Sequence, residues 1–202
     1  MRLRSCIRGR SLVYNSRRTT RHGRNLRGIA RRIRHLDRAL FRAVFGVKWA
    51  PLTSVMRAFT VAGRAGALWG FLAAVGFLIS GLEPSRLLIP WTAIAAAWTV
   101  AEGTKYLFDR TRPFLWDTEI APLIKTPSSS SFPSGHAATA AAGALTLSFL
   151  YPPFAPVLVL AGFLVVLSRV YLGVHFPFDV LAGVVIGTAI SAGVMAIAGL
   201  LV

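Results

Sequence analysis

Three short polar clusters carry residue types that can bind and transfer a phosphoryl group. The first runs from Lys105 to Arg112-Pro113, and the second is Pro133-Ser134-Gly135-His136. The third is Ser168-Arg169, followed by His175 and Asp179. Lysine and arginine supply fixed positive charge for phosphate oxygens, whereas a histidine can act as a nucleophile or as a proton donor. Together the three clusters predict a phosphate-transfer site.

In the first cluster, Lys105 and Arg112 are seven residues apart, which in a helix is two turns or about 10 Å of rise. If the helix persists, both side chains lie on nearly the same face and can reach one anion. Because Pro113 disfavours helical geometry at the residue before it, the helix is expected to loosen at Arg112. The alternative is that these cations only anchor a membrane span at the headgroups.

The second cluster immediately precedes a helix of small residues that is expected to begin at Ala137. Free N–H groups and the helix dipole favour an anion at a helix N-terminus. Gly135 leaves room for close approach, Ser134 adds a hydroxyl group, and His136 can protonate a leaving oxygen. The serine run at 128–131 is expected to be a flexible loop.

In the third cluster, His175 follows Arg169 by six residues and precedes Asp179 by four. Proline is tolerated in the first turn of a helix, so Pro177 allows a helix to start near Phe176. Asp179 then lies one turn from His175 and can accept its ring N–H. That bond would fix the tautomer and leave the other ring nitrogen free to attack.

The segments that connect the clusters are apolar enough for a membrane bundle, with 54% hydrophobic residues and a mean hydropathy of +0.59. The stretches without charge are Ala65–Leu82, Leu87–Ala101, Ala137–Ser168 and Val180–Val202, and prolines 152 and 153 divide the third into two helices. Since backbone groups in lipid must pair internally and period-two alternation is missing, an all-α bundle of five transmembrane helices is predicted. Five antiparallel crossings would place all three clusters on one face.

Positive charge is concentrated near the N-terminus, because 17 of the 23 Lys and Arg lie in residues 1–64, with Asp37 as the one acidic residue there. Residues 1–26, rich in Arg and Ser, are expected to be a disordered basic tail. Residues 27–62 are expected to form amphipathic interfacial helices before a transmembrane domain at 63–202. The apolar face of the first of these helices is Ile29, Ile33, Leu36, Leu40 and Val44. Such a helix suits an anionic bilayer surface; a transit peptide and a nucleic-acid-binding tail are the alternatives.

In order and spacing, the three clusters closely resemble the signature motifs of the type 2 phosphatidic-acid phosphatase superfamily. The resemblance covers Lys105 to Asp179 directly and, through the helical layout, most of Gly66 to Val202. It implies that His175 attacks phosphorus to form a phosphohistidine, that Asp179 orients it, and that His136 protonates the leaving group and then activates water. The residues implied to bind the phosphoryl group are Lys105, Arg112, Ser134, Gly135 and Arg169.

The resemblance and the apolar bundle together predict a multi-pass cell-membrane phosphatase acting on the terminal phosphate of a lipid phosphate or polyprenyl (di)phosphate. Its expected partners are that lipid and, for the basic N-terminus, anionic headgroups. The resemblance implies that no metal is needed, which agrees with the absence of any acidic cluster able to hold magnesium in the sequence, and no cofactor is expected. The alternatives are a lipid phosphotransferase and a non-catalytic membrane protein that binds lipid phosphate or nucleic acid.

Many members of this superfamily have six spans, whereas five are predicted here. Residues 41–61 occupy the place of the missing span, but they include Arg42, Lys48 and Arg57. Each central charge would cost about 2.5 to 3.5 kcal/mol in hydrocarbon. With the basic N-terminus held in the cytoplasm, five spans put the active site on the cytoplasmic face.

Overall fold

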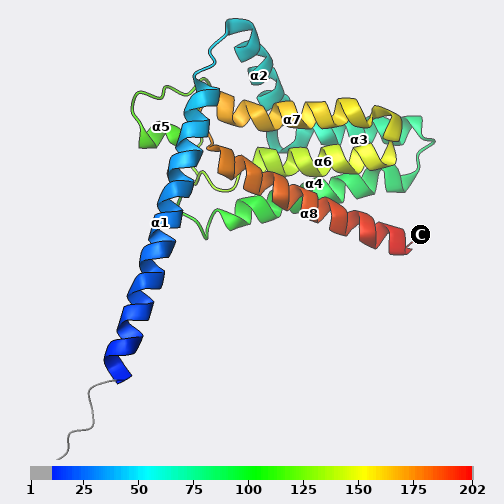
Figure 1. Cartoon of the computed structure of the whole chain (residues 1–202). Helices are drawn as coiled ribbons and strands as arrows, with labels where there is room; N and C mark the ends of the chain where they lie inside the picture. Colours follow the sequence, from blue (N-terminus) through cyan, green and yellow to red (C-terminus); the bar gives the residue numbers. More distant parts are fainter. Residues whose placement is uncertain (1–10, 202) are drawn as a thin grey trace, which may run out of the picture. The chain divides into compact units, whose positions relative to one another are not determined.

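A computed structural model describes residues 11–201, with side chains from 28 to 199, and every regular element in this part is helical (Figure 1). The all-α prediction is therefore confirmed for these residues. The helices are α1 Ser11–Phe45, α2 Ala50–Ala62, η1 Arg64–Gly66, α3 Ala67–Ile79, α4 Pro84–Thr104, α5 Pro113–Trp116, α6 Gly135–Leu150, η2 Pro152–Phe154, α7 Ala155–Tyr171 and α8 Pro177–Leu201.

The chain divides into two compact units, Met1–Ala39 and Leu40–Val202. In the first unit, α1 begins at Ser11, although disorder was predicted as far as residue 26. The segment contains no proline, and arginine is a good helix former, which explains the helix. Residues 1–10 of the predicted tail lie outside the described residues.

Helix α6 is the central helix of the second unit, and it packs against α4, α7 and α8, which run beside it in Figure 1. Its buried residues are mostly alanine and glycine, so neighbouring backbones approach closely. Gly143 of α6 makes room for the fully buried ring of Trp69. On α8, a side chain at Gly183 or Gly187 would overlap a backbone carbonyl of the α6 segment.

This close approach makes Gly187 a sensitive position of the bundle. Gly187→Leu is expected to lower the free energy of unfolding by about 1–3 kcal/mol, because the added side chain must push α8 away from Ala138. Gly193→Leu is the matched control, since the space around Gly193 in the same helix is open. Thermal unfolding in detergent would measure both, and equal melting temperatures for the two variants would contradict the expected packing.

Two helices of the described part are long and apolar enough to cross a membrane, Pro152–Tyr171 and Pro177–Gly199. A third candidate is a pair, Ala50–Ala62 with Arg64–Ile79, bent by 51°. The bend is at Ala65 and Gly66, which have positive φ angles of 48° and 79°. Length and apolar composition thus identify two or three candidate spans among the described residues, and the five spans expected from the sequence stay a prediction.

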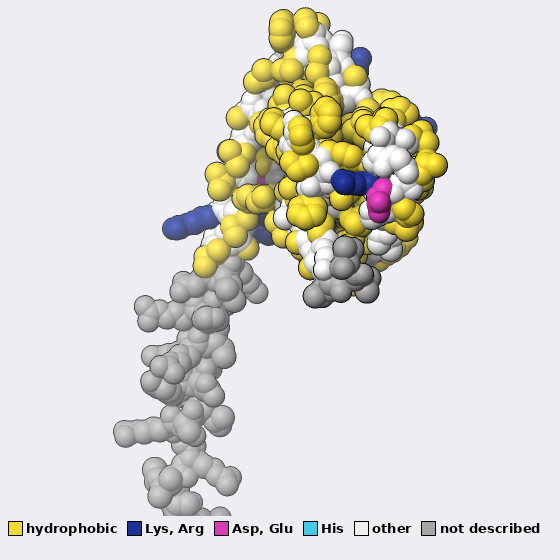
Figure 2. Space-filling model, turned by 90° about the vertical axis from the view of Figure 1, so that its right-hand side faces the viewer, with side chains coloured by type: hydrophobic (Ala, Val, Ile, Leu, Met, Phe, Trp, Pro, Cys, Tyr) yellow, Lys and Arg dark blue, Asp and Glu magenta, His cyan; other side chains and the backbone are white. Residues whose placement is uncertain are grey.

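The outer surface of the bundle is apolar, as expected for a membrane protein. Hydrophobic side chains cover most of the face that Figure 2 presents. Large apolar residues exposed on α7 and α8 include Val157, Leu160, Phe163, Leu181, Val185 and Ile197. An apolar surface of this extent suits contact with lipid chains rather than with water.

Candidate active site

The structure brings the three polar clusters together around one cavity of about 260 Å³. Six of the eight predicted site residues line it: Lys105, Arg112, Gly135, His136, Arg169 and His175. The other two, Ser134 and Asp179, are fully buried and do not line the cavity. The clusters lie where α4 and α7 end and where α6 and α8 begin.

The end of α7 places His175 beside Arg169. Gly173 adopts a left-handed φ of 81°, and the N–H groups of Val174 and His175 both donate to the Arg169 carbonyl at 3.2 Å. The N–H of Gly173 donates to the Val170 carbonyl at 3.0 Å. This is a glycine-dependent helix end, and it folds the chain back toward Arg169.

Asp179 is the third residue of α8, where it accepts hydrogen bonds from three groups and has the His175 ring as a fourth neighbour. Its Oδ2 accepts the N–H of Phe176 at 2.8 Å, as in a capping box. The same oxygen accepts the hydroxyl of Ser131 at 2.5 Å, and Oδ1 lies 2.5 Å from Nη1 of Arg110. The fourth neighbour is the His175 ring, whose Nδ1 is 3.7 Å from Oδ2.

The predicted direct hydrogen bond from His175 to Asp179 is therefore absent, because that distance is too long. Nδ1 of His175 instead donates to the Ser131 carbonyl at 2.8 Å. A carbonyl oxygen can only accept, so the ring proton is on Nδ1 and the lone pair is on Nε2. Asp179 acts on the ring indirectly, since it holds Ser131, whose carbonyl orients His175.

Arg112 precedes α5 with extended backbone angles of φ −77° and ψ 158°, as Pro113 predicted. However, α4 ends at Thr104, so Lys105 and Arg112 do not share a helix face. Pro113 restricts only the residue directly before it, so it does not explain why α4 ends at Thr104. The loop, rather than helical periodicity, brings both cations to the cavity.

The serine run 128–131 is bound tightly to Arg112, in contrast to the flexible loop that was predicted. The buried guanidinium donates to the carbonyls of Ser129 at 2.9 Å and Ser130 at 3.2 Å. It also donates to the Val174 carbonyl at 2.8 Å, and Nη1 is 3.3 Å from Nε2 of His175. A buried arginine requires acceptors for its donors, and the loop carbonyls supply them.

Glu102 lies in the cavity and was not predicted as a site residue. Its Oε1 is 2.6 Å from Nζ of Lys105, which is also 3.4 Å from the Ser129 hydroxyl. A Cβ at Gly135 would lie 2.7 Å from the same Oε1. The Glu102 carboxylate therefore occupies the space that a side chain at position 135 would need. Glu102 and Lys105 are three residues apart at the end of α4, and this spacing is the sequence feature that could have identified Glu102 as a site residue.

Ser134 serves as the N-cap of α6, since its hydroxyl accepts the N–H of Ala137 at 3.4 Å. Its own N–H donates to the Asp179 carbonyl at 3.0 Å. The predicted contact of Ser134 with phosphate stays a prediction, because a hydroxyl that accepts the Ala137 N–H still has its own proton to donate. The cap leaves Gly135 and His136 in the first turn, where both line the cavity.

Arg169 is 3% exposed and lies at the wall of the cavity. Its Nη1 donates to the hydroxyl of Thr60, whereas its Nε has no partner among the described residues. Because this buried positive charge lines the cavity, an anion bound there would compensate it.

The electrostatic environment keeps His175 neutral. Burial lowers the pKa of His175 well below the usual 6.5, and the nearby charges of Arg169, Arg112 and Lys105 lower it further. Burial also lowers the pKa of Arg112, although Asp179 and Glu102 oppose this effect. The cavity therefore presents an uncharged imidazole beside fixed cations. Within the described residues, no group of three or more Cys, His, Asp or Glu is placed to hold a metal ion.

The lowered pKa predicts the protonation behaviour of His175. At about pH 6.5, where an ordinary histidine is half protonated, His175 should still be neutral and should take up a proton only at lower pH. Because the unfolded chain takes up that proton first, the folded state loses stability as the pH falls below about 6.5. Histidine NMR, with the signal assigned by its loss in His175→Gln, would test this; half-protonation at pH 6.5 would contradict it.

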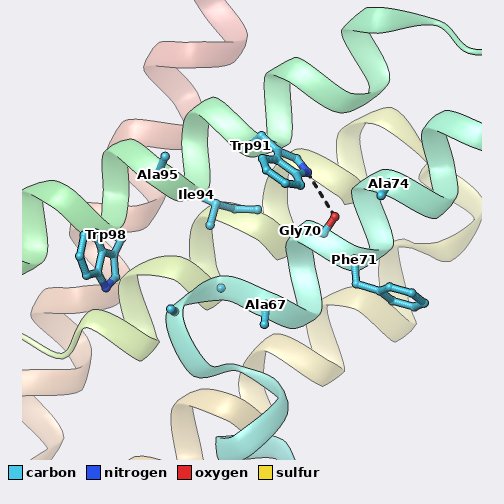
Figure 3. Close-up of a pocket in the computed structure, with 10 residues that line it drawn as sticks. Ala67, Gly70, Phe71, Ala74, Trp91, Ile94, Ala95 and Trp98 are labelled. Carbon is cyan, nitrogen blue, oxygen red and sulfur yellow. Dashed lines mark hydrogen bonds between the residues drawn. The ribbon is translucent and has the colours of Figure 1, made fainter.

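Two further hollows border the cavity. An apolar groove of about 560 Å³ lies between α3 and α4 (Figure 3) and shares Ala65 and Trp98 with the cavity. A second hollow, of about 700 Å³, shares Arg64, Pro127, His136 and Arg169 with it.

Residues 86–201 match the family model described as the PAP2 superfamily. The chain is 34% identical over 140 residues to a decaprenylphosphoryl-5-phosphoribose phosphatase of Mycobacterium tuberculosis, covering 65% of this chain and 72% of that protein. It is 40% identical over 96 residues to an undecaprenyl-diphosphatase of Sulfolobus acidocaldarius, and thus spans about half of that relative, with 47% of each covered. A solved transmembrane PAP2-type phosphatidylglycerolphosphate phosphatase of Bacillus subtilis has a TM-score of 0.67 and 28% identity, covering 83% of this chain and 86% of that one.

Proposed function

The chain belongs to the PAP2 superfamily, and on this basis we propose that it is a membrane phosphatase that hydrolyses the terminal phosphate of a lipid phosphate or polyprenyl diphosphate. The observation that carries the proposal is the cavity, in which a buried, neutral His175 is surrounded by Lys105, Arg112 and Arg169. Such a site holds a phosphoryl group against a nitrogen with a free lone pair.

The proposed reaction has two displacements. Nε2 of His175 attacks phosphorus, the bond from phosphorus to the leaving oxygen breaks, and His136 gives that oxygen a proton. His136 then removes a proton from water, which attacks the phosphohistidine, releases phosphate and restores His175. Lys105, Arg112, Arg169 and the Gly135 backbone bind the phosphoryl oxygens and the charge that develops on them. No metal is required for these steps.

The apolar groove between α3 and α4 supports a lipid substrate. Its lining is apolar, with Trp91 and Trp98 contributed by α4 and Ala67 and Ala74 by α3 (Figure 3). Because the groove meets the catalytic cavity at Ala65, a hydrocarbon chain can occupy it while the phosphate is in the cavity. The relatives from M. tuberculosis and S. acidocaldarius are named for polyprenyl lipids, which supports a prenyl chain.

Filling the groove should weaken the binding of long-chain substrates. Ala74→Phe is expected to raise KM for a polyprenyl phosphate about tenfold, since excluding two methylene groups from an apolar site costs about 1.6 kcal/mol. Val75→Phe is the matched control, because Val75 is the next residue of α3 and does not line the groove. Steady-state kinetics would measure both variants, and equal KM values would remove the groove from the proposal.

The activity itself is tested by measuring phosphate release from farnesyl diphosphate and phosphatidate by purified protein in detergent with excess chelator. Release in chelator is the expected result, and its absence for every lipid phosphate would refute the proposal. Adding a short alcohol distinguishes hydrolysis from transfer, because a phosphotransferase would form the phosphorylated alcohol.

The proposal includes a membrane arrangement with five crossings, a cytoplasmic N-terminus and a cytoplasmic active site. The exposed apolar residues Ile29, Ile33 and Leu36 of α1 support contact of the basic helix with anionic headgroups. A cysteine introduced at Thr118, in a Cys6→Ser background, should react with an impermeant reagent only after cells are permeabilised. Reaction in intact cells would place the active site on the outer face.

A further inference from the structure

We infer that Arg110 is a positioning residue for the proposed reaction, which holds the attacking histidine in place without touching the substrate. The inference rests on the proposed function and deepens it, because it adds to that site a residue with a defined task. Arg110 lies between Lys105 and Arg112 in the first polar cluster, and it was not among the predicted site residues. It lines none of the three hollows, so it acts on phosphorus only through the residues that it holds.

The side chain of Arg110 binds the carboxylate at the start of α8. Its Nη1 lies 2.5 Å from Oδ1 of Asp179, whose side chain is fully buried, whereas the Arg110 side chain is 28% exposed. The guanidinium carbon lies 4.8 Å from the centre of the Phe176 ring, over which a planar cation stacks. A buried carboxylate needs a compensating charge, and Arg110 supplies it from the solvent side.

The backbone of Arg110 binds the serine loop that orients His175. Its carbonyl accepts the N–H of Ser131 at 2.9 Å, and its N–H donates to the hydroxyl of Ser130 at 3.2 Å. The hydroxyl of Ser131 in turn donates to Oδ2 of Asp179 at 2.5 Å. Arg110, Ser131 and Asp179 therefore form a closed ring of contacts. The carbonyl of the same Ser131 accepts the Nδ1–H of His175 at 2.8 Å.

The two arginines of this segment thus have different tasks. Arg112 lines the cavity and donates to carbonyls of the serine loop, whereas Arg110 fixes that loop to the start of α8. A nitrogen that attacks phosphorus must be in line with the leaving oxygen, and a displacement of about 1 Å costs about 10²-fold in rate. Arg110 therefore contributes to kcat, by restricting the ring of His175, and not to the binding of phosphate.

Arg110→Ala tests the inference with farnesyl diphosphate as the substrate in detergent. We expect kcat to fall about 10- to 100-fold, because the ring of His175 is held less well, while KM stays within about threefold. Guanidinium ion, added well below denaturing concentrations, should restore part of the lost kcat, because the partly exposed side chain leaves a space that solvent reaches. Sodium ion at the same ionic strength should restore none of it.

Arg86→Ala is the matched control at the opposite end of α4. Arg86 also donates to a backbone carbonyl, that of Leu150, and its guanidinium carbon lies 5.3 Å from the centre of the Tyr151 ring. Because Arg86 lines none of the hollows, its loss can lower the melting temperature but should leave kcat unchanged, with or without guanidinium. The comparison separates an arginine that only stabilises the fold from one that positions the reacting ring.

The outcomes separate the inference from the proposed function. If Arg110→Ala changes KM alone, keeps the kcat of the unmodified protein, or regains no activity with guanidinium, the positioning role is refuted while the phosphatase activity stands. If the unmodified protein releases phosphate from no lipid phosphate, the proposed function itself fails.

Arg110→Lys and Arg110→Gln serve where the alanine variant does not fold. Their kcat values should fall in the order arginine, lysine, glutamine at similar KM, because lysine keeps the charge opposite Asp179 but lacks the planar fork. Equal kcat values for the three proteins would refute the inference.

Discussion

His175→Ala is expected to lower kcat for phosphate release by at least about 10⁴-fold, the loss typical of removing a nucleophile that forms a covalent intermediate. His175 presents a lone pair on Nε2, because Nδ1 donates to the Ser131 carbonyl at 2.8 Å. No other described side chain of the cavity combines that lone pair with burial behind three cations. Alanine leaves the phosphate site intact but gives phosphorus no attacking atom.

His35→Ala is the matched control for this variant, because His35 is an exposed histidine on α1 that lines none of the hollows. It should keep the activity of the unmodified protein. A melting temperature for His175→Ala close to that of the unmodified protein would show that the loss is chemical. Activity within tenfold of the unmodified protein would exclude His175 as the nucleophile.

The intermediate gives a second measure of the same mechanism. In His136→Gln, the water attack loses its base, so the phosphohistidine should persist after rapid mixing with labelled substrate. The label should be stable to alkali and labile to acid, as expected for a phosphorus–nitrogen bond, and should map to His175. Label on any other residue would contradict the assigned roles.

Asp179→Asn is expected to lower both stability and kcat. The carboxylate is fully buried, and its Oδ1 is 2.5 Å from Nη1 of Arg110. Removing this carboxylate costs about 1–3 kcal/mol, less than breaking a fully buried ion pair, because the Arg110 side chain is 28% exposed and stays partly solvated. The Ser131 loop then loses its anchor, the ring of His175 is held less well, and kcat should fall by about 10²-fold or more. Thermal unfolding and steady-state kinetics measure the two effects.

A double-mutant cycle with Ser131→Ala tests whether Asp179 acts on His175 through this loop. Ser131→Ala removes the hydroxyl that bonds to Oδ2 at 2.5 Å but keeps the carbonyl that orients the ring. Non-additive effects on kcat are expected, since the two side chains form one network. Purely additive losses would show that Asp179 acts on the ring directly. Asp109→Asn, an exposed carboxylate that lines none of the hollows, is the control.

The sequence alone determined the local geometry of the clusters, because each depends on backbone chemistry within a few residues. Pro113 keeps Arg112 out of a helix, and Pro177 starts α8 two residues after His175. The charge-free stretches determined that the clusters alternate with apolar helices. These signals were sufficient to predict the all-α bundle and the convergence of Lys105, Arg112, His136, Arg169 and His175 at one cavity.

Helix lengths and the count of spans were less accessible from the sequence. The bend at Ala65 and Gly66 lies at the start of the charge-free stretch Ala65–Leu82, and with it the helices Ala50–Ala62 and Arg64–Ile79 form one candidate bent span. Gly66 permits the left-handed φ of 79° at the bend, but glycine is common in membrane helices, so its presence in the sequence does not by itself locate a bend.

Only the tertiary structure decided which polar groups pair inside the site. Asp179 is four residues from His175, yet it bonds to Ser131 and Arg110, which are 48 and 69 residues away in the sequence. A buried carboxylate pairs with the donors that packing brings closest, and spacing along the chain identifies only the donors that are near in sequence. For the same reason the contacts of the serine loop and of Glu102 became visible only when the helices were assembled.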